Sequence, residues 1–169
     1  PGPAAGRGQR DAGRRVGAEA GLDVRRRRVR REEPGGRLRL LELPDELLPP
    51  GLDEFIFHAC MKEFNILLGH PERNIELQKK PAYAERLKEY GTYFQITTSS
   101  LSGGFGWRIK RTAMRLLKKG MVDVISTDAH RCEDYSHVPK ALAAAERIVG
   151  PDRLNDLVST MPRTILKLS

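Results

Sequence analysis

The sequence is poor in cysteine and in long apolar stretches, and both shortages exclude classes of protein. Its two cysteines, Cys60 and Cys132, lie far apart and lack the close spacing of a zinc knuckle or a disulfide framework. No apolar run approaches the roughly 20 residues that cross a bilayer, and the arginine-rich start lacks the apolar core of a secretory signal. We therefore expect a cytoplasmic protein without membrane insertion.

Aromatic residues are also missing from the start of the chain, where most of the positive charge lies. The net charge is +8, and residues 1–40 carry twelve Arg against five acidic residues, a net of +7. We expect residues 1–37 to be a disordered or divergent Arg- and Gly-rich segment and residues 38–169 to form the folded part. A basic nucleic-acid-binding protein is the alternative, because cationic runs bind phosphate backbones without a fold. No aromatic residue interleaves the arginines to stack on bases, which disfavours the recognition of single strands.

From Leu38 onward, short apolar runs alternate with longer stretches of helical periodicity. The runs predict four strands, at residues 38–41, 64–68, 93–97 and 122–125. The periodic stretches predict helices at residues 53–62, 81–90, 107–119, 139–149 and 151–159. This alternation predicts an α/β fold with parallel strands and right-handed crossovers. The chain begins at Pro1, so we expect a fragment or a processed chain. Four strands do not close a barrel and would leave an unpaired sheet edge, which a missing N-terminal half or a partner could cover.

Potential metal ligands follow three of the four predicted strands. Glu42 follows the first strand, His70 and Arg73 the second, and Asp128 and His130 the last. The carboxyl ends of parallel strands face a common crevice. Carboxylates and imidazoles suit Mn, Fe, Zn or Mg ions, which can clamp a phosphoryl group and generate a hydroxide nucleophile. Each residue alone could be a plain surface residue, but the agreement of three strand ends predicts a metal-dependent phosphoesterase site, with Arg73 as a bidentate phosphate ligand.

Other candidate residues carry weaker signals. His58 is expected on a helix surface, and the role of His137 stays open. Residues 103–106 are superficially similar to a phosphate loop but lack its Lys and Ser/Thr, so a flexible loop is the better interpretation.

Three segments carry a resemblance to a known family. They are His70-Pro71-Glu72-Arg73-Asn74, then Gln95-Ile96-Thr97 with residues 100–106, then Ile125-Ser126-Thr127-Asp128-Ala129-His130. Together they resemble the manganese-dependent protein-tyrosine phosphatases of bacterial capsule and exopolysaccharide loci, within the polymerase and histidinol phosphatase (PHP) superfamily. The resemblance covers residues 38–169. It implies part of a distorted, TIM-like β/α barrel with its N-terminal strands missing or altered. It also implies two or three Mn²⁺ ions, with Fe, Zn or Mg as alternatives, and hydrolysis of phosphotyrosine on a bacterial tyrosine kinase that controls polysaccharide biosynthesis.

The resemblance also assigns roles to single residues. The implied metal ligands are Glu19, Glu42, His70, Asp128 and His130, and the implied catalytic residues are Arg73 and Asp128. The family's early His-x-His motif has no counterpart, because no histidine precedes Glu19. Its second phosphate-binding Arg is also missing, and Arg131 or His137 would have to replace it. We therefore expect this chain alone to bind metal weakly and to hydrolyse p-nitrophenyl phosphate slowly or not at all.

Other functions stay open at this point. A PHP phosphoesterase could act on a small ester such as histidinol phosphate or a nucleotide, and the missing histidines also suit a catalytically inactive relative. The physiological metal and a homo-oligomeric state are left open as well.

Overall fold

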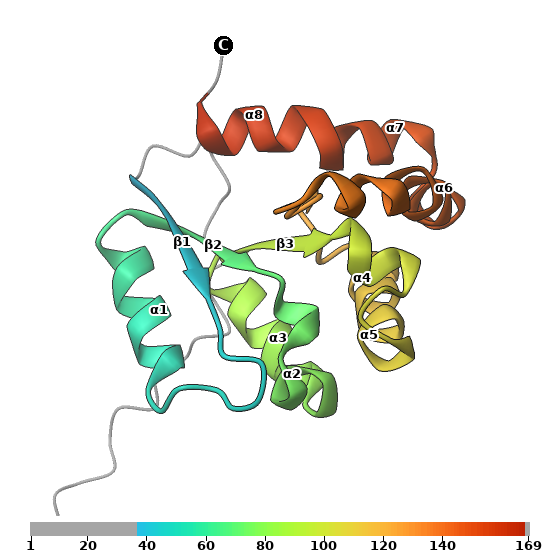
Figure 1. The fold of residues 1–169 in the computed structure, drawn as a ribbon. Helices are drawn as coiled ribbons and strands as arrows, with labels where there is room; N and C mark the ends of the chain where they lie inside the picture. The colour runs from blue at the N-terminus through green and yellow to red at the C-terminus, as the bar shows by residue number, and fades with distance from the viewer. Residues whose placement is uncertain (1–36, 168–169) are drawn as a thin grey trace, which may run out of the picture.

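A computed structural model describes residues 37–167, and their core is a four-stranded sheet (Figure 1). The strands are β1 (Arg37–Glu42), β2 (Phe64–Gly69), β3 (Tyr93–Thr97) and β4 (Val124–Ser126). They lie in the order β1-β2-β3-β4, and every neighbouring pair is parallel. The predicted α/β class with parallel strands is therefore confirmed. β3 is buried at all five positions, as expected for a parallel strand covered on both faces.

Helices follow each strand, and five of them begin at or close to the positions that the periodicity predicts. The α-helices are α1 (Leu52–Met61), α2 (Ile75–Lys79), α3 (Pro81–Glu89), α4 (Thr98–Ser102), α5 (Trp107–Lys118), α6 (Val138–Val149), α7 (Pro151–Asn155) and α8 (Met161–Leu166). Two 3₁₀ segments, η2 (Pro71–Arg73) and η3 (Cys132–His137), and a π-helical turn, η4 (Asp156–Thr160), complete the elements. No helix among residues 37–167 is long and apolar enough to cross a membrane.

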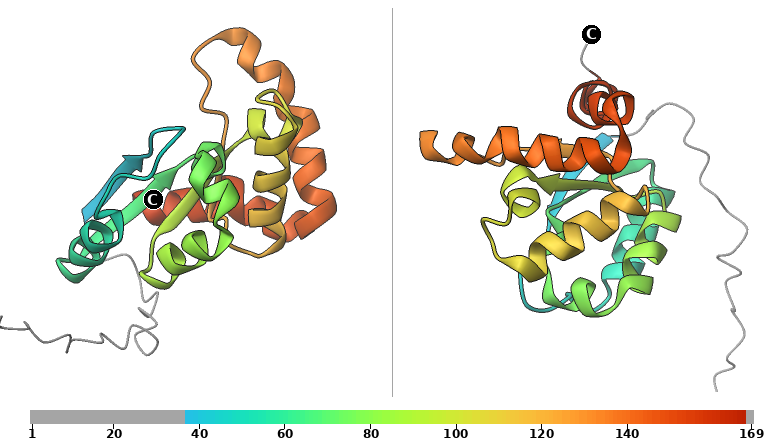
Figure 2. Two further views of the ribbon diagram at one scale, coloured as in Figure 1. Left: turned by 90° about the horizontal axis from the view of Figure 1, so that it is seen from below. Right: turned by 90° about the vertical axis from the view of Figure 1, so that its right-hand side faces the viewer.

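The sheet is covered on both faces by helices (Figures 1 and 2). Helices α1, α3 and α5 lie on one face, over the larger core, which includes Leu68 and Phe94. The C-terminal helix α8 lies on the other face, where Ile165 packs with Tyr93 and Val124. Consecutive residues of a strand thus face opposite cores, as the pleat requires. This packing fixes which strand ends lie side by side.

Two predicted boundaries are wrong. The strand predicted from residue 122 begins only at Val124, because Asp123 bonds to β3 with its side chain as well as its backbone. Its backbone N–H donates to the Phe94 carbonyl (2.9 Å), and its carboxylate accepts from the Phe94 N–H (2.7 Å). The helix predicted to end at residue 159 continues to Leu166, with η4 just before Pro162. A proline inside a helix removes a backbone donor and crowds the preceding turn, and the wider π turn accommodates it.

Candidate metal and phosphate site

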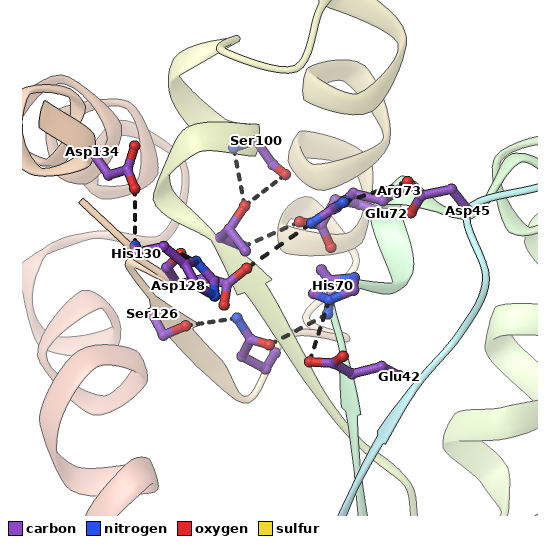
Figure 3. Close-up of polar contacts among 12 residues, drawn as sticks. Glu42, Asp45, His70, Glu72, Arg73, Ser100, Ser126, Asp128, His130 and Asp134 are labelled. Carbon is purple, nitrogen blue, oxygen red and sulfur yellow. Dashed lines mark hydrogen bonds and ion pairs between the residues drawn. The ribbon is translucent and has the colours of Figure 1, made fainter.

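The ends of β1 and β2 bring Glu42 and His70 together. Glu42 pairs in register with Gly69, the residue before His70. Glu42 Oε1 lies 3.6 Å from His70 Nε2 (Figure 3). Gly69 permits this approach, since a Cβ at that position would lie 3.2 Å from Glu42 Cγ and 3.6 Å from Gln95 Oε1. The absence of a side chain at Gly69 therefore allows the Glu42 carboxylate to lie beside the His70 ring.

We expect Gly69→Ala to weaken metal binding several-fold while changing the melting temperature little. The new methyl group would push the flexible, exposed side chain of Glu42 aside, which a few tenths of an ångström accomplishes. Mn²⁺ titration of the two proteins by calorimetry measures the affinity, and a thermal melt without metal measures the stability. Unchanged metal affinity in the variant would remove Glu42 from the ligand set.

His70 is held by its backbone, and its ring keeps a free nitrogen. Its φ of 34° lies in the left-handed region, which is uncommon for a residue with a side chain and clusters at functional sites. Its backbone N–H donates to Gln95 Oε1 (3.3 Å), and Gln95 Nε2 donates to Ser126 Oγ (2.7 Å) on β4. The buried Nδ1 atom has no hydrogen-bond partner. A buried, unpaired ring nitrogen suits a ligand of the site.

Arg73 lies at the rim of the site between two carboxylates. Its NH2 atom is 3.4 Å from Asp45 Oδ2, and its NH1 atom is 4.0 Å from Asp128 Oδ2 (Figure 3). Its Cζ atom lies 5.0 Å from the centroid of the Phe105 ring, within cation–π range. The guanidinium thus reaches both the strand ends and the turn after α4. Its planar fork can grip two oxygens of a phosphoryl group in place of the two carboxylates.

Glu72 lies between His70 and Arg73 in sequence but points into the protein. Its side chain is fully buried, and its Oε1 atom accepts from the Thr97 N–H (3.1 Å). Burial raises the pKa of Glu72 to about 7, against the opposing effect of its hydrogen bonds to Ser100 and Thr97. Its Oε2 atom has no hydrogen-bond partner. This carboxyl ties η2 to the junction of β3 and α4 and so positions its two neighbours.

The loop after β4 presents Asp128 and His130. Asp128 also has a positive φ, of 51°, and its carbonyl oxygen lies 3.0 Å from His130 Nδ1. Asp134 accepts from the N–H groups of His130 (2.9 Å) and Arg131 (3.0 Å), and these bonds lower the pKa of Asp134. Both candidate ligands are exposed at the surface of the loop. Asp134 therefore shapes the loop that carries them.

The structure brings the predicted residues together in pairs. Glu42 contacts His70, and Arg73 contacts Asp128, all at the same edge of the sheet. Among residues 37–167, no group of three His, Cys, Asp or Glu side chains is placed to hold a metal ion. Glu19 lies outside the described residues. The donor types and the unpaired His70 nitrogen fit a divalent metal, as part of a ligand set. A single metal site made by all five predicted ligands stays a prediction.

A comparison with protein-family models shows which family the chain belongs to. The family model described as "Capsular polysaccharide synthesis, CpsB/CapC" matches residues 50–167, which include three of the four strands. The chain belongs to the CpsB/CapC family.

Individual relatives agree with this family. The tyrosine-protein phosphatase YwqE of Bacillus subtilis is 30% identical over 114 residues, which are 67% of this chain and 45% of YwqE. CapC of Staphylococcus aureus is 28% identical over 103 residues, which are 61% of this chain and 40% of CapC. The chain thus spans a little under half the length of these CpsB/CapC relatives.

The fold is also similar to a solved structure. It comes from crystal structures of YwqE from Bacillus subtilis and CpsB from Streptococcus pneumoniae, described as unique metal-dependent tyrosine phosphatases. The TM-score is 0.71 at 26% identity, over 79% of this chain and 55% of the solved chain. The predicted resemblance to the capsule-locus phosphatases is confirmed.

Several residues that support this candidate site have no role predicted from the sequence. Gln95 connects the ends of β2 and β4 through hydrogen bonds, and Asp45 forms an ion pair with Arg73. The buried Glu72 accepts a hydrogen bond from the Thr97 N–H. The histidines with weaker signals lie elsewhere. His58 is exposed on α1 with its ring edge-on to Phe57, and His137 is exposed at the end of η3.

Proposed function

We propose that this CpsB/CapC chain forms part of a metal-dependent phosphatase that hydrolyses phosphotyrosine on proteins. The observation that carries the proposal is the pairing of residues at the carboxyl ends of the strands. Nε2 of His70 lies beside Glu42 while its buried Nδ1 is unpaired, and Arg73 lies beside Asp128. The former pair offers metal ligands, and the guanidinium offers a phosphate ligand. The tyrosine-phosphatase and metal-dependence descriptions of the relatives support this substrate over small phosphate esters.

The chemistry of each side chain determines its proposed role. Glu42, His70, Asp128 and His130, with Glu19, would hold the metal, for which we propose Mn²⁺. When bound, the metal supplies Lewis-acid stabilisation of the phosphoryl oxygens and a nucleophile at neutral pH. Arg73 binds two phosphoryl oxygens and stabilises the charge that grows on them in the transition state.

The wider setting follows from the family and is part of the same proposal. The four-stranded sheet would be a segment of a distorted β/α barrel of the PHP type. The substrate protein would be a bacterial tyrosine kinase in capsule or exopolysaccharide biosynthesis, and the reaction would take place in the cytoplasm. The capsule-synthesis description of the matching family supports this partner class.

The direct test is hydrolysis of a phosphotyrosine peptide with excess Mn²⁺. Because the described residues bring no three ligands together, we expect slow turnover that chelator and Asp128→Ala both abolish. Asp152→Ala, on α7, is the matched control and should keep the wild-type rate. Turnover that survives chelator would contradict the metal role. A preference for histidinol phosphate or a nucleotide would contradict the protein substrate.

A further inference from the structure

A groove opens beside Arg73. It lies between α2 and the first turns of α5, and its volume is about 900 Å³. Arg73 and Asp45 are among its lining residues, so the groove adjoins the proposed phosphate ligand. Residues next to a phosphotyrosine bound by Arg73 would therefore contact the residues that line the groove.

The groove is strongly cationic. Arg73, Lys79, Arg108, Arg111 and Arg115 line it. Among residues 37–167, Asp45, already paired with Arg73, is its single acidic lining residue. Arg108 and Arg111 are exposed and form no ion pair with any residue in the range 37–167. Arg115 instead donates to the Gln78 carbonyl (3.2 Å) and so joins α5 to α2. Two guanidinium groups are therefore available to a ligand.

Two aromatic side chains border the same groove. Phe105 is 46% exposed and Trp107 is 65% exposed, which is unusual for side chains of this size. Phe105 contacts the guanidinium of Arg73, and Arg108 lies over the Trp107 ring with its Cζ atom 5.6 Å from the centroid. Arginine with exposed aromatic rings is the composition of energetically important contacts in protein recognition.

We infer that this groove binds acidic residues next to the phosphotyrosine, in an extended segment of the substrate protein. The inference rests on the proposed function, because Arg73 must hold the phosphoryl group for the flanking residues to reach the groove. The lining of α5 from Trp107 to Arg115 extends about 12 Å at 1.5 Å per residue. This length accommodates about four residues of extended chain. Glu and Asp side chains complement the unpaired Arg108 and Arg111.

The charge distribution favours a peptide over a nucleic acid. Residues 41–169 hold 18 basic and 17 acidic residues, so the groove is a local concentration of cations in a nearly neutral part of the chain. Nucleic-acid sites use longer basic stripes that follow a backbone of repeated phosphates. A groove about four residues long that includes one proposed phosphate ligand matches a short acidic segment.

Trp107 is the single tryptophan of the chain and lines the groove, so its fluorescence reports binding directly. The probes are two phosphotyrosine peptides of equal length, one with Glu on both sides of the phosphotyrosine and one with Ser. We expect about tenfold tighter binding of the acidic peptide at low salt, and this preference should shrink at high salt. The double variant Arg108→Gln/Arg111→Gln should lose the preference. The matched control Lys118→Gln/Lys140→Gln removes two exposed charges outside the groove and should keep it.

The outcomes distinguish a failure of the proposed peptide groove from a failure of the proposed function. Equal affinities for the two peptides, or equal loss of the preference in both double variants, would overturn the groove. An oligonucleotide that binds as tightly as the acidic peptide, and requires Arg108 and Arg111, would overturn the peptide assignment. If the acidic peptide binds preferentially but neither peptide is hydrolysed with metal, the groove stands and the proposed function fails. If both are hydrolysed and bound equally well, the function stands and the groove fails.

Discussion

Arg73→Lys should lower kcat/KM for a phosphotyrosine peptide by about a hundredfold, and Arg73→Ala by about a thousandfold. Lysine keeps the positive charge but not the two parallel N–H groups that the guanidinium presents to phosphoryl oxygens. It also cannot contact Asp45 and Asp128 at once, as Arg73 does. Initial rates of phosphate release with excess Mn²⁺ measure the effect.

The control for Arg73 is another arginine in an ion pair. Arg86 on α3 pairs with Asp53, and neither residue lies at the carboxyl ends of the strands. Arg86→Lys should keep kcat/KM within about twofold, because surface ion pairs contribute little. Wild-type turnover in Arg73→Lys would show that the guanidinium geometry does not matter and that the phosphate ligand lies elsewhere.

As the pH rises from 4 to 8, the free energy of unfolding of the wild-type protein should fall by about 3 kcal/mol relative to that of Glu72→Gln. The pKa of the buried Glu72 is about 7 in the folded protein and has an ordinary value of 4.5. Below the lower value the carboxyl is protonated in both states. Between the two values the unfolded chain releases the proton while the folded protein keeps it, so rising pH favours unfolding. Above pH 7 the carboxyl is ionised in both states, and the loss of unfolding free energy is complete.

Urea denaturation of the two proteins in chelator, at several pH values, isolates this effect. Glutamine keeps an oxygen that accepts from the Thr97 N–H but cannot ionise. Glu72→Ala serves as the contrast, because it leaves that buried N–H unpaired and should destabilise the protein at every pH. Parallel stability curves for wild type and Glu72→Gln would mean that Glu72 does not titrate in this range.

The sequence predicts the frame of the site but not its supporting contacts. The strand β3 has the predicted bounds, 93–97, because its apolar run is bounded by turn residues. Helices α2 and α4 have five residues each, too few for a helical period to be recognised. Once the strands are placed, Glu42, His70 and Asp128 follow the carboxyl ends of the strands, where Glu42 contacts His70 and Asp128 contacts Arg73.

The supporting contacts depend on residues far apart in the chain. The bond from Gln95 to Ser126 spans 31 positions, and the contact of Arg73 with Asp45 spans 28. Neither is fixed by local propensity or periodicity, because side-chain packing in three dimensions selects the partner. The burial of Glu72, beside two residues that face the site, likewise follows from the 3₁₀ geometry of η2 and not from the motif.

The amide of Gln95 gives the site a property that no single ligand has. Because it accepts from the backbone of His70 and donates to Ser126, the ends of β2 and β4 form one preorganised unit. The entropy cost of aligning these ends is met when the chain folds, and the exposed side chains of Glu42, Asp128 and His130 remain to be ordered by a ligand. Less of the binding energy of the proposed phosphoryl ligand would then be lost in ordering the strand ends.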